Sequence, residues 1–289
     1  MTKEKEYIFE DEVVIIGGSD WKPKKNSKQS NKWKIIALIL TSIIALVGLF
    51  YIGRHIYHIK EFIQSRYAND VIVALSEPMK GKAGVTPMTE EFMGVKLKIY
   101  RLDGLKAHFA DTVPDCTDSS IYLVTRSSDY KIVNEKKEII GDYILNGKVL
   151  QNSSWRAGFM AIVDGNAQIG IDRSNKILKH VKENEGSMFR QLALVSASIK
   201  CANQFILKGK VTRCAYGRDK NNTLYYIETE NPETLYGFAD ALIEYGFIDA
   251  IYVTGGKQPD LFYRTEDGIP HGSFIDDKPH ELVVWTRAK

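Results

Sequence analysis

The densest group of polar side chains in the sequence lies in its last third, around a pair of glycines. Arg213 opens the run Arg213-Cys214-Ala215-Tyr216-Gly217, and the chain later reaches Thr254-Gly255-Gly256. The polar residues that follow the glycines are Lys257, Asp260, Arg264, Asp267 and His271. Arginine and lysine bind phosphate or carboxylate through charge-assisted hydrogen bonds, and paired glycines let backbone N–H groups approach a ligand closely. The pattern indicates an anion site; the alternative is a solvated loop with scattered charges.

A strand–helix–strand unit connects the two groups. Residues 224–229 and 248–253 are the aromatic and β-branched runs typical of strands, and residues 235–245 carry apolar side chains at helical spacing. Asn231 and Pro232 are expected to open the helix, and Gly246 to end it. Two strands joined by a packed helix usually lie parallel, and ligands bind beyond the carboxyl ends of such strands. We therefore expect Arg213 and Gly255-Gly256 at one sheet edge.

The rest of the body is dominated by short strand-like runs. These runs are residues 95–102, 121–125, 159–163, 168–171, 205–207 and 282–286. Residues 160–171 predict a hairpin that turns at Asp164-Gly165. Residues 187–200 place Leu192, Val195 and Ile199 on one face and predict a second helix. The expected fold class is α/β of the mixed α+β kind: one domain with a mixed β-sheet and packed helices, preceded by one transmembrane helix.

Residues 35–53 contain no charged side chain. Nineteen helical residues reach about 28 Å, close to the hydrocarbon thickness of a bilayer. A signal peptide or a buried core helix are the alternatives, but a signal peptide lies at the very start of a chain. Six lysines precede the span and three cations follow it: Lys22, Lys24, Lys25, Lys28, Lys32 and Lys34, then Arg54, Lys60 and Arg66. The positive-inside rule then predicts a single-pass protein of the cytoplasmic membrane, with a cytoplasmic N-terminus and an external C-terminal domain.

The span is expected to continue as a helical neck. Ile52, Ile56, Ile59 and Ile63 form a stripe on one helical face. The stripe rests on the body or on lipid headgroups, or it forms the seam of a weak homodimer. The expected organisation is a cytoplasmic tail at 1–34, a transmembrane helix at 35–53, a helical neck and linker at 54–91, and an extracytoplasmic domain at 92–289.

Charge and composition exclude several classes of protein. Lys and Arg total 39 and Asp and Glu total 36, so the net charge is +3, and residues 1–34 carry +2 of it. A nearly neutral body does not predict nucleic-acid binding, which needs a basic face. No phosphate-binding loop or dinucleotide fingerprint occurs, and the six histidines form no metal-ligand pair, so no cofactor and no metal are expected. Cys201 and Cys214 either form a disulfide or are two buried thiols on neighbouring strands.

The run from Arg213 to Gly256 resembles the C-terminal half of the phosphodiester glycosidase domain. That family includes the enzyme that uncovers mannose 6-phosphate on lysosomal enzymes, and many bacterial surface proteins. Arg213-Cys214-Ala215-Tyr216-Gly217 resembles the family's Arg-Thr-Ala-Ile-Gly strand, and residues 250–256 resemble the strand before its Asp-Gly-Gly-Gly-Ser motif. Thr254 replaces the Asp of that motif, and Lys257 and Gln258 replace its last Gly and Ser. The family's earlier Asn-Gly-Gly-Phe-Phe element is not visible in residues 123–128.

The resemblance implies two functions from different classes. The first is hydrolysis of a sugar–phosphodiester linkage in a surface glycan, with Arg213 on the phosphate, the amides of Gly255-Gly256 supporting it, and Asp260 or Asp267 as acid or base. The second is a catalytically inactive glycan-binding or envelope-assembly module on the same scaffold, which the loss of the motif's Asp favours. Thr254, Lys257, Arg264 and His271 complete the expected ligand site. A cell-envelope scaffold without a ligand is a third possibility.

Overall fold

The computed structural model describes residues 29–128, 130–134, 136–152, 157–172, 175–202, 205, 208–256, 261–273 and 281–287. The chain divides into two units, residues 1–58 and 59–289. In the first unit, helix α1 (Gln29–Leu75) begins, and its segment Lys32–Tyr57 is long and apolar enough to cross a membrane. None of that segment is buried inside the protein. The continuation of the helix beyond residue 53 is therefore as predicted.

The second unit contains three antiparallel sheets, which we call sheets I, II and III. Sheet I has the order β1 (Gly84–Phe92), β2 (Val95–Asp103), β15 (Leu224–Thr229), β14 (Thr212–Arg218), β16 (Asp249–Gly256), β12 (Ala193–Ser196), β13 (Ile199–Lys200). Sheet II has the order β10 (Asn166–Ile171), β9 (Gly158–Val163), β11 (Ser187–Gln191), β7 (Tyr143–Leu145), β8 (Lys148–Gln151). Sheet III has the order β18 (Pro270–Ser273), β17 (Leu261–Arg264), β4 (Ile121–Arg126), β19 (Leu282–Arg287), β3 (Leu105–Ala110). Strands β5 (Tyr130–Val133) and β6 (Lys136–Ile139) form a separate pair.

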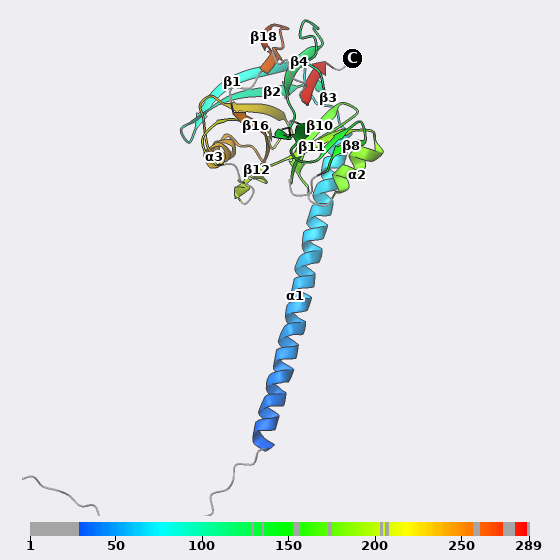
Figure 1. The fold of residues 1–289 in the computed structure, drawn as a ribbon, viewed down its shortest axis with the longest axis vertical. Coiled ribbons are helices and arrows are strands. Elements are labelled where there is room, and N and C mark those ends of the chain that lie inside the picture. Colours follow the sequence, from blue (N-terminus) through cyan, green and yellow to red (C-terminus); the bar gives the residue numbers. More distant parts are fainter. Residues whose placement is uncertain are drawn as a thin grey trace, which may run out of the picture. The chain divides into compact units, whose positions relative to one another are not determined.

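Helix α3 (Leu235–Tyr245) covers one face of sheet I, as Figure 1 shows beside β16 and β12. Leu235, Phe238 and Leu242 are buried there against side chains such as Ile227. Gly246 ends the helix in the left-handed conformation with φ of 111°, as predicted. The helix is capped by Thr234 and not by Asn231, because the Thr234 side chain accepts the N–H of Gly237. The predicted start was wrong because Glu233 pairs with Val211 and holds the preceding residues outside the helix.

The other face of sheet I packs against sheets II and III. The core between the three sheets includes Tyr216 and Ile251 from sheet I, Met160 from sheet II and Trp285 from sheet III. Trp285 donates its indole N–H to the Tyr216 hydroxyl at 3.0 Å, so the polar atom of each buried ring is satisfied. This packing fixes sheet III over one end of sheet I.

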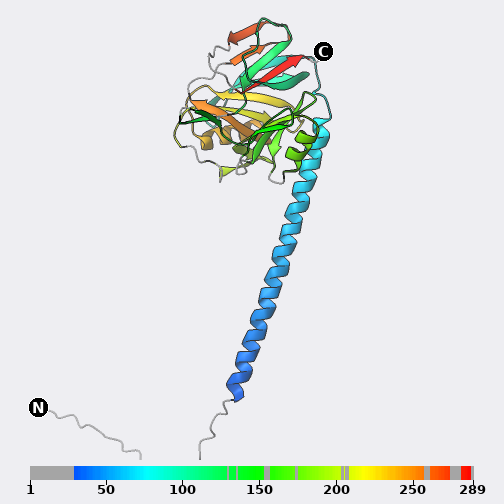
Figure 2. The same ribbon diagram turned by 45° about the vertical axis from the view of Figure 1, so that its right-hand side comes forward.

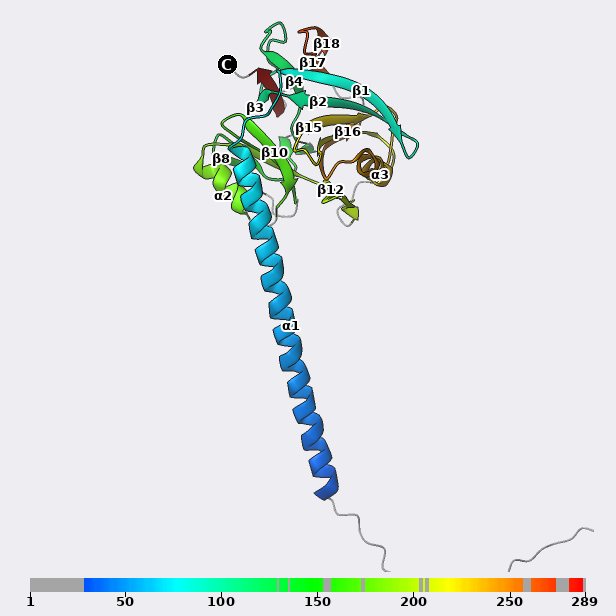
Figure 3. The same cartoon turned by 180° about the vertical axis from the view of Figure 1, so that it is seen from behind.

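The last turns of α1 and helix α2 (Lys176–Glu183) pack on sheet II, where Figure 3 shows the end of α1 beside β10. Ala68, Val71 and Leu75 are buried in this contact. The amide of Asn166 donates to the carbonyl of Leu75, and the Tyr67 hydroxyl accepts the N–H of Ile171. The end of α1 is therefore an integral part of the second unit.

The α+β fold class and the hairpin at Asp164-Gly165 are confirmed, and three details differ from expectation. Strands β15 and β16 run in the same direction, but β14 lies between them, so the sheet is antiparallel and not mixed. Residues 187–200 form β11, β12 and β13 in place of the predicted helix. Strand β1 lies within the segment expected to be linker and pairs along its whole length with β2.

Candidate functional site

The residues expected to form an anion site meet at one end of sheet I, where β14 begins and β16 ends. Thr212 pairs with Gly256, and Arg213 pairs with Gly255. A β-bulge follows between Arg213 and Ala215, so the strands diverge from regular register at this point. The expected proximity of Arg213 and the glycine pair is therefore present. We call this group the glycine end of sheet I.

The Arg213 side chain is buried and turned toward the protein's own backbone. It is 2% exposed. Its Nε donates to the carbonyl oxygen of Glu233 at 3.0 Å, its Nη2 to that of Gly209 at 2.9 Å, and its Nη1 to the Tyr252 hydroxyl at 3.4 Å. These contacts tie the connections before β14 and α3 to strand β16. A guanidinium held in this way contributes to folding, because its donors are already engaged.

The two glycines are exposed, whereas Thr254 before them is buried. A Cβ atom at Gly255 would lie 2.8 Å from the carbonyl oxygen of Thr212, which is too close for any other residue. Gly256 has a φ of +126°, which side-chain-bearing residues rarely adopt. Packing alone thus accounts for both glycines. Lys257 and Asp260 lie outside the described residues.

Arg264, Asp267 and His271 belong to a different sheet. They lie on the β17–β18 hairpin of sheet III, which Figure 2 shows in orange in one layer with the red strand β19. Arg264 is 7% exposed and donates to the carbonyl oxygens of Ile121, Gly268, Cys116 and Asp118 at 3.0, 2.9, 3.1 and 3.3 Å. Asp267 and His271 are exposed. The structure therefore does not bring these residues together with Arg213 in one cluster.

A buried polar cluster that the sequence analysis missed lies at the same end of sheet I, on the face opposite Arg213. Glu228 pairs with Cys214 on one side and with Lys98 on the other, and its side chain is 3% exposed. Burial raises the pKa of Glu228 to about 7, although the Tyr226 hydroxyl and the Lys98 ammonium both lower it. Oε1 of Glu228 has no hydrogen-bond partner among the described residues. A carboxyl group with this pKa is partly protonated near neutral pH and is able to donate or accept a proton there.

The end of strand β4 adds a cation to this cluster. Burial and Glu228 raise the pKa of the Cys214 thiol, while Arg126 lies near enough to lower it. Arg126 is the last residue of β4 and is followed by the buried Ser127 and Ser128. We call Arg126, Cys214, Tyr226 and Glu228 the inner polar cluster. It combines a cation, a thiol, a phenol and a carboxyl group of raised pKa in the space between sheets I and III.

Aromatic rings connect the inner polar cluster to His271. The ring of Tyr226 lies 6.1 Å from that of Tyr100, Tyr100 lies 5.1 Å from Tyr263, and His271 stacks on Tyr263 at 4.8 Å. His271 itself is exposed, and the rings of Tyr263 and Tyr100 lie between it and Tyr226. One feature of the sequence could have identified Glu228. It is the single carboxylate in an aromatic strand, and its position two residues after Tyr226 and four after Leu224 puts it on the same inward-facing side.

Within the described ranges, no group of three or more His, Cys, Asp or Glu side chains is placed to hold a metal ion. None of the three cysteines, all of which lie in the described ranges, is in a disulfide: Cys214 is buried, whereas Cys116 and Cys201 are partly exposed. The disulfide considered for Cys201 and Cys214 is therefore not formed.

Comparison with known proteins shows a similarity of fold and no similarity of sequence. No family model and no curated protein matches the sequence. The structure is similar to the catalytic domain of zebrafish N-acetylglucosamine-1-phosphodiester alpha-N-acetylglucosaminidase, auto-inhibited by its pro-peptide, with a TM-score of 0.51 and 12% identity over 73% of this chain and 87% of that chain. A hypothetical protein from Synechocystis gives a TM-score of 0.48 and 9% identity over 71% of this chain and 62% of that one. The chain therefore has a fold similar to that of a phosphodiester glycosidase domain.

Proposed function

We propose that this chain is a membrane-anchored, extracytoplasmic protein that binds a glycan of the cell envelope without cleaving it. The fold similarity to a phosphodiester glycosidase domain supports the class of ligand. One observation carries the choice of binding over hydrolysis: the Arg213 side chain is buried, and each of its three nitrogens donates to an acceptor within the protein, namely two backbone carbonyl oxygens and the Tyr252 hydroxyl. A phosphate group at the glycine end would have to displace these internal bonds, each of which costs free energy to break.

The anchoring part of the proposal rests on α1. Its segment Lys32–Tyr57 has a mean hydropathy of 2.8 and exposes all of its apolar side chains. An apolar helix with no protein against it is stable in a bilayer, where its backbone bonds are satisfied internally. The excess of lysines before the segment supports a location of the second unit outside the cytoplasm.

Hydrolysis is the second candidate, and Glu228 is the observation that favours it. A carboxyl group with a pKa of about 7 suits a general acid that protonates the departing sugar or phosphate oxygen while water attacks. Arg126, at the end of β4, would then stabilise the phosphate. The acid is buried under Tyr100 and Tyr226, so this candidate requires the inner polar cluster to open to its substrate.

A single set of measurements separates the candidates. Full-length protein in detergent is incubated with a panel of sugar-1-phosphodiesters, and both binding and released sugar are measured. We expect saturable binding without release. Release that is abolished by Glu228→Gln, but not by Glu244→Gln on the exposed face of α3, would replace our proposal with hydrolysis. If neither binding nor release of sugar is observed, the third hypothesis, a cell-envelope scaffold without a ligand, would be favoured.

A further inference from the structure

The inner polar cluster is closed to solvent although it contains an ionisable group. Glu228 is 3% exposed, and Cys214 beside it is fully buried. Oε1 of Glu228 has no hydrogen-bond partner among the described residues. Buried polar atoms are nearly always hydrogen-bonded, and an exception marks stored strain or a place that a further molecule enters. The side from which a molecule could reach Glu228 is therefore a question of function.

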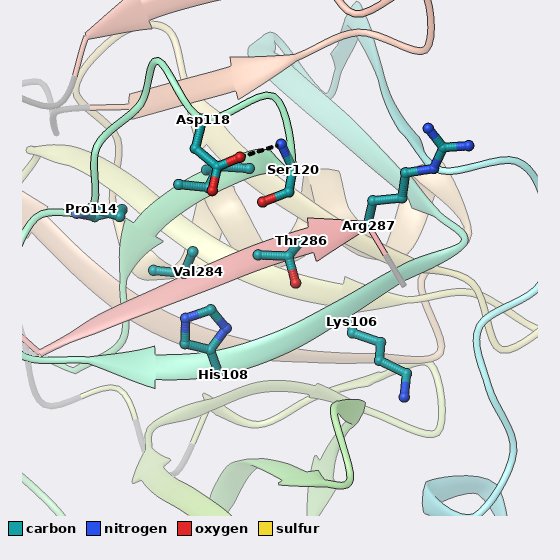
Figure 4. Close-up of a pocket in the computed structure, with 9 residues that line it drawn as sticks. Lys106, His108, Pro114, Asp118, Ser120, Val284, Thr286 and Arg287 are labelled. Atoms are coloured by element: carbon teal, nitrogen blue, oxygen red, sulfur yellow. Dashed lines mark hydrogen bonds between the residues drawn. The ribbon is translucent and has the colours of Figure 1, made fainter. Parts of the chain in front are cut away.

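The cavity that Figure 4 shows does not lead to this cluster. It measures about 510 Å³ and lies on the face of sheet III that is turned away from sheet I, over Val284, Thr286 and His108. None of the described residues that line it belongs to the inner polar cluster. Trp285 projects from the opposite face of β19 into the core and separates the two spaces. Access to Glu228 therefore has to come from another side.

Two tyrosine rings lie between the inner polar cluster and the surface on the side of β2. Tyr100 is the cross-strand neighbour of Tyr226, and burial followed by the charge of Glu228 raises the pKa of Tyr100, so its hydroxyl lies near that carboxyl group. The Tyr263 ring lies 5.1 Å from the Tyr100 ring and is half-buried. His271 stacks on the Tyr263 ring and is exposed. We call Tyr100 and Tyr263 the tyrosine gate.

The two rings of the gate belong to different sheets. Tyr100 is on β2 of sheet I, and Tyr263 is on β17 of sheet III. Strand β17 pairs with β4 at two positions, and its other neighbour, β18, is exposed along its whole length. Arg264 fixes the backbone next to Tyr263 through carbonyl oxygens such as that of Ile121. The gate can therefore open by rotation of the half-buried Tyr263 ring, while the hairpin stays in place.

The charge of Glu228 decides whether the closed gate is favourable. The titratable and charged groups that face Glu228 are Lys98 and Tyr100 on β2, Cys214 on β14, Tyr226 on β15, Arg126 on β4 and Tyr263 on β17. Lys98 is half-buried and lowers the pKa of Glu228, yet burial outweighs it. A protonated carboxyl group is tolerated in such a place, whereas a carboxylate with an unbonded oxygen is unfavourable until water reaches it.

We infer that the tyrosine gate is a pH-sensitive switch, closed over protonated Glu228 and opened when Glu228 is ionised, so that water and small polar molecules reach the inner polar cluster. The inference goes beyond the proposed function, because it concerns access to the cluster and needs no ligand. A cluster that opens after Glu228 has lost its proton offers an entering ligand a carboxylate and not an acid. This agrees with binding of a glycan without cleavage.

Cys214 reports the opening, because it lies beside Glu228 inside the cluster. The partly exposed cysteines are first removed by Cys116→Ser and Cys201→Ser, so that methyl methanethiosulfonate labels Cys214 alone in full-length protein in detergent. Glu228→Gln in the same background keeps the shape of the side chain without its charge. Dividing by the labelling rate of this variant at each pH removes the effect of the changing thiolate fraction.

We expect the ratio of the two labelling rates to increase roughly 25-fold from pH 5.5 to pH 8. The reason is that Glu228 has its ordinary pKa of 4.5 when the gate is open and a pKa of about 7 when it is closed, so a rising pH favours the open state. A ratio that does not change with pH would overturn the switch. It would show that Lys98 or Arg126 neutralises the carboxylate inside a closed cluster.

A second pair of variants tests the gate itself. Tyr263→Ala should raise the labelling rate of Cys214 at pH 5.5 about tenfold or more, because half of the cover is gone and local opening costs less. Tyr236→Ala is the matched control, since Tyr236 is an exposed tyrosine on α3, and it should leave the rate unchanged. An unchanged rate in Tyr263→Ala would show that these rings are not the route.

Urea separates opening of the gate from unfolding of the second unit. Opening the gate exposes little surface, so the labelling rate at pH 8 should change little between 0 and 1 M urea. A rate that rises with urea as steeply as global unfolding would show that ionisation of Glu228 unfolds the second unit, and would overturn the switch. None of these measurements uses a saccharide, so their failure is distinguishable from failure of the proposed glycan binding.

Discussion

Two buried arginines, Arg213 and Arg264, have the same kind of partner. Each donates from its Nε and from a terminal nitrogen to backbone carbonyl oxygens of the segments that surround it. A guanidinium presents five donors in a fixed plane, so one side chain satisfies several carbonyl groups that no strand or helix reaches. In this chain the residue types expected at an anion site therefore hold loops in place.

Arg213→Ala is expected to destabilise the second unit. The change removes the two bonds to the carbonyl groups of Gly209 and Glu233 and leaves a cavity where the buried side chain was, so we expect the free energy of unfolding to fall by about 3 kcal/mol. Urea unfolding of the full-length protein in detergent, followed by near-ultraviolet circular dichroism, measures the change. Arg101→Ala is the control, because its bridge to Asp103 is exposed and such pairs contribute under about 1 kcal/mol. Unchanged stability in Arg213→Ala would contradict this structural role and favour the original expectation that the guanidinium binds an anion.

Glu228 predicts how stability changes with pH. Its pKa is about 7 in the folded protein against 4.5 as the ordinary value, so between these pH values the folded state binds more protons than the unfolded state. The contribution of Glu228 to the free energy of unfolding is therefore fully present below about pH 4.5 and is lost as the pH rises through about 7. The free energy of unfolding differs by roughly 3 kcal/mol between the two limits. We expect Glu228→Gln to remove this dependence and to be more stable than the wild type at pH 8. Urea midpoints measured from pH 4.5 to pH 8 test this, and parallel curves for the two proteins would contradict it.

The sequence located the glycine end but not the inner polar cluster. Arg213 and Gly255 were placed together correctly, because strand order and the family resemblance bring them to one sheet edge. The sequence does not predict the role of Arg213, since the direction of its buried side chain depends on the carbonyl groups of Gly209 and Glu233, which only the folded structure brings near it. Glu228 and Arg126 were missed because they lie on strands separated by about one hundred residues, and only the packing of sheet III on sheet I brings them close.

Among the helices and strands, the sequence predicts correctly those features that depend on neighbouring residues alone. Gly246 ends α3, and Asp164-Gly165 turns the β9–β10 hairpin with φ values of 50° and 81°. Residues 187–200 show the opposite case. Leu192, Val195 and Ile199 have helical spacing, yet Leu192, Ala193, Leu194 and Val195 are all fully buried. A continuous apolar run fits a strand covered on both faces as well as it fits a helix, and here the sheets decide.

The contact between α1 and sheet II depends on Gly170. The Tyr67 hydroxyl occupies the space that a Cβ atom at Gly170 would fill, and it also accepts the N–H of Ile171. We expect Gly170→Ala to displace Tyr67 and to cost about 1–3 kcal/mol. Hydrogen exchange of the amides of residues 71–75 should increase in parallel as the end of the helix detaches.

A second substitution tests whether the Tyr67 hydroxyl is the reason for the loss of stability in Gly170→Ala. Tyr67→Phe removes the hydroxyl and makes room for the new methyl group, so adding it to Gly170→Ala should recover part of the lost stability. Strictly additive losses in the double variant would show that Gly170 is needed for another reason, such as its own strand geometry.

At the level of the whole molecule, the two units require different surroundings. The apolar side chains of Lys32–Tyr57 are exposed, whereas the second unit buries its apolar side chains between three sheets, α2, α3 and the end of α1. Exposed apolar surface of this size is unfavourable in water and favourable in lipid. The segment Lys32–Tyr57 is therefore long and apolar enough to cross a bilayer.

The charges that flank the apolar segment predict the side of the membrane on which the sheets lie. Six lysines lie between residues 22 and 34, while Arg54, Lys60 and Arg66 follow the apolar segment. Cations are retained on the cytoplasmic side during insertion, so the larger group should fix the N-terminus there and send the second unit across. Alkaline phosphatase fused after Lys289 should be active, because it folds only outside the cytoplasm, and green fluorescent protein fused there should be dark. Replacing the six lysines by glutamine reverses the charge bias and should lower phosphatase activity while fluorescence appears. A fluorescent, phosphatase-negative wild-type protein would place the sheets in the cytoplasm and remove the envelope glycan from the proposed function.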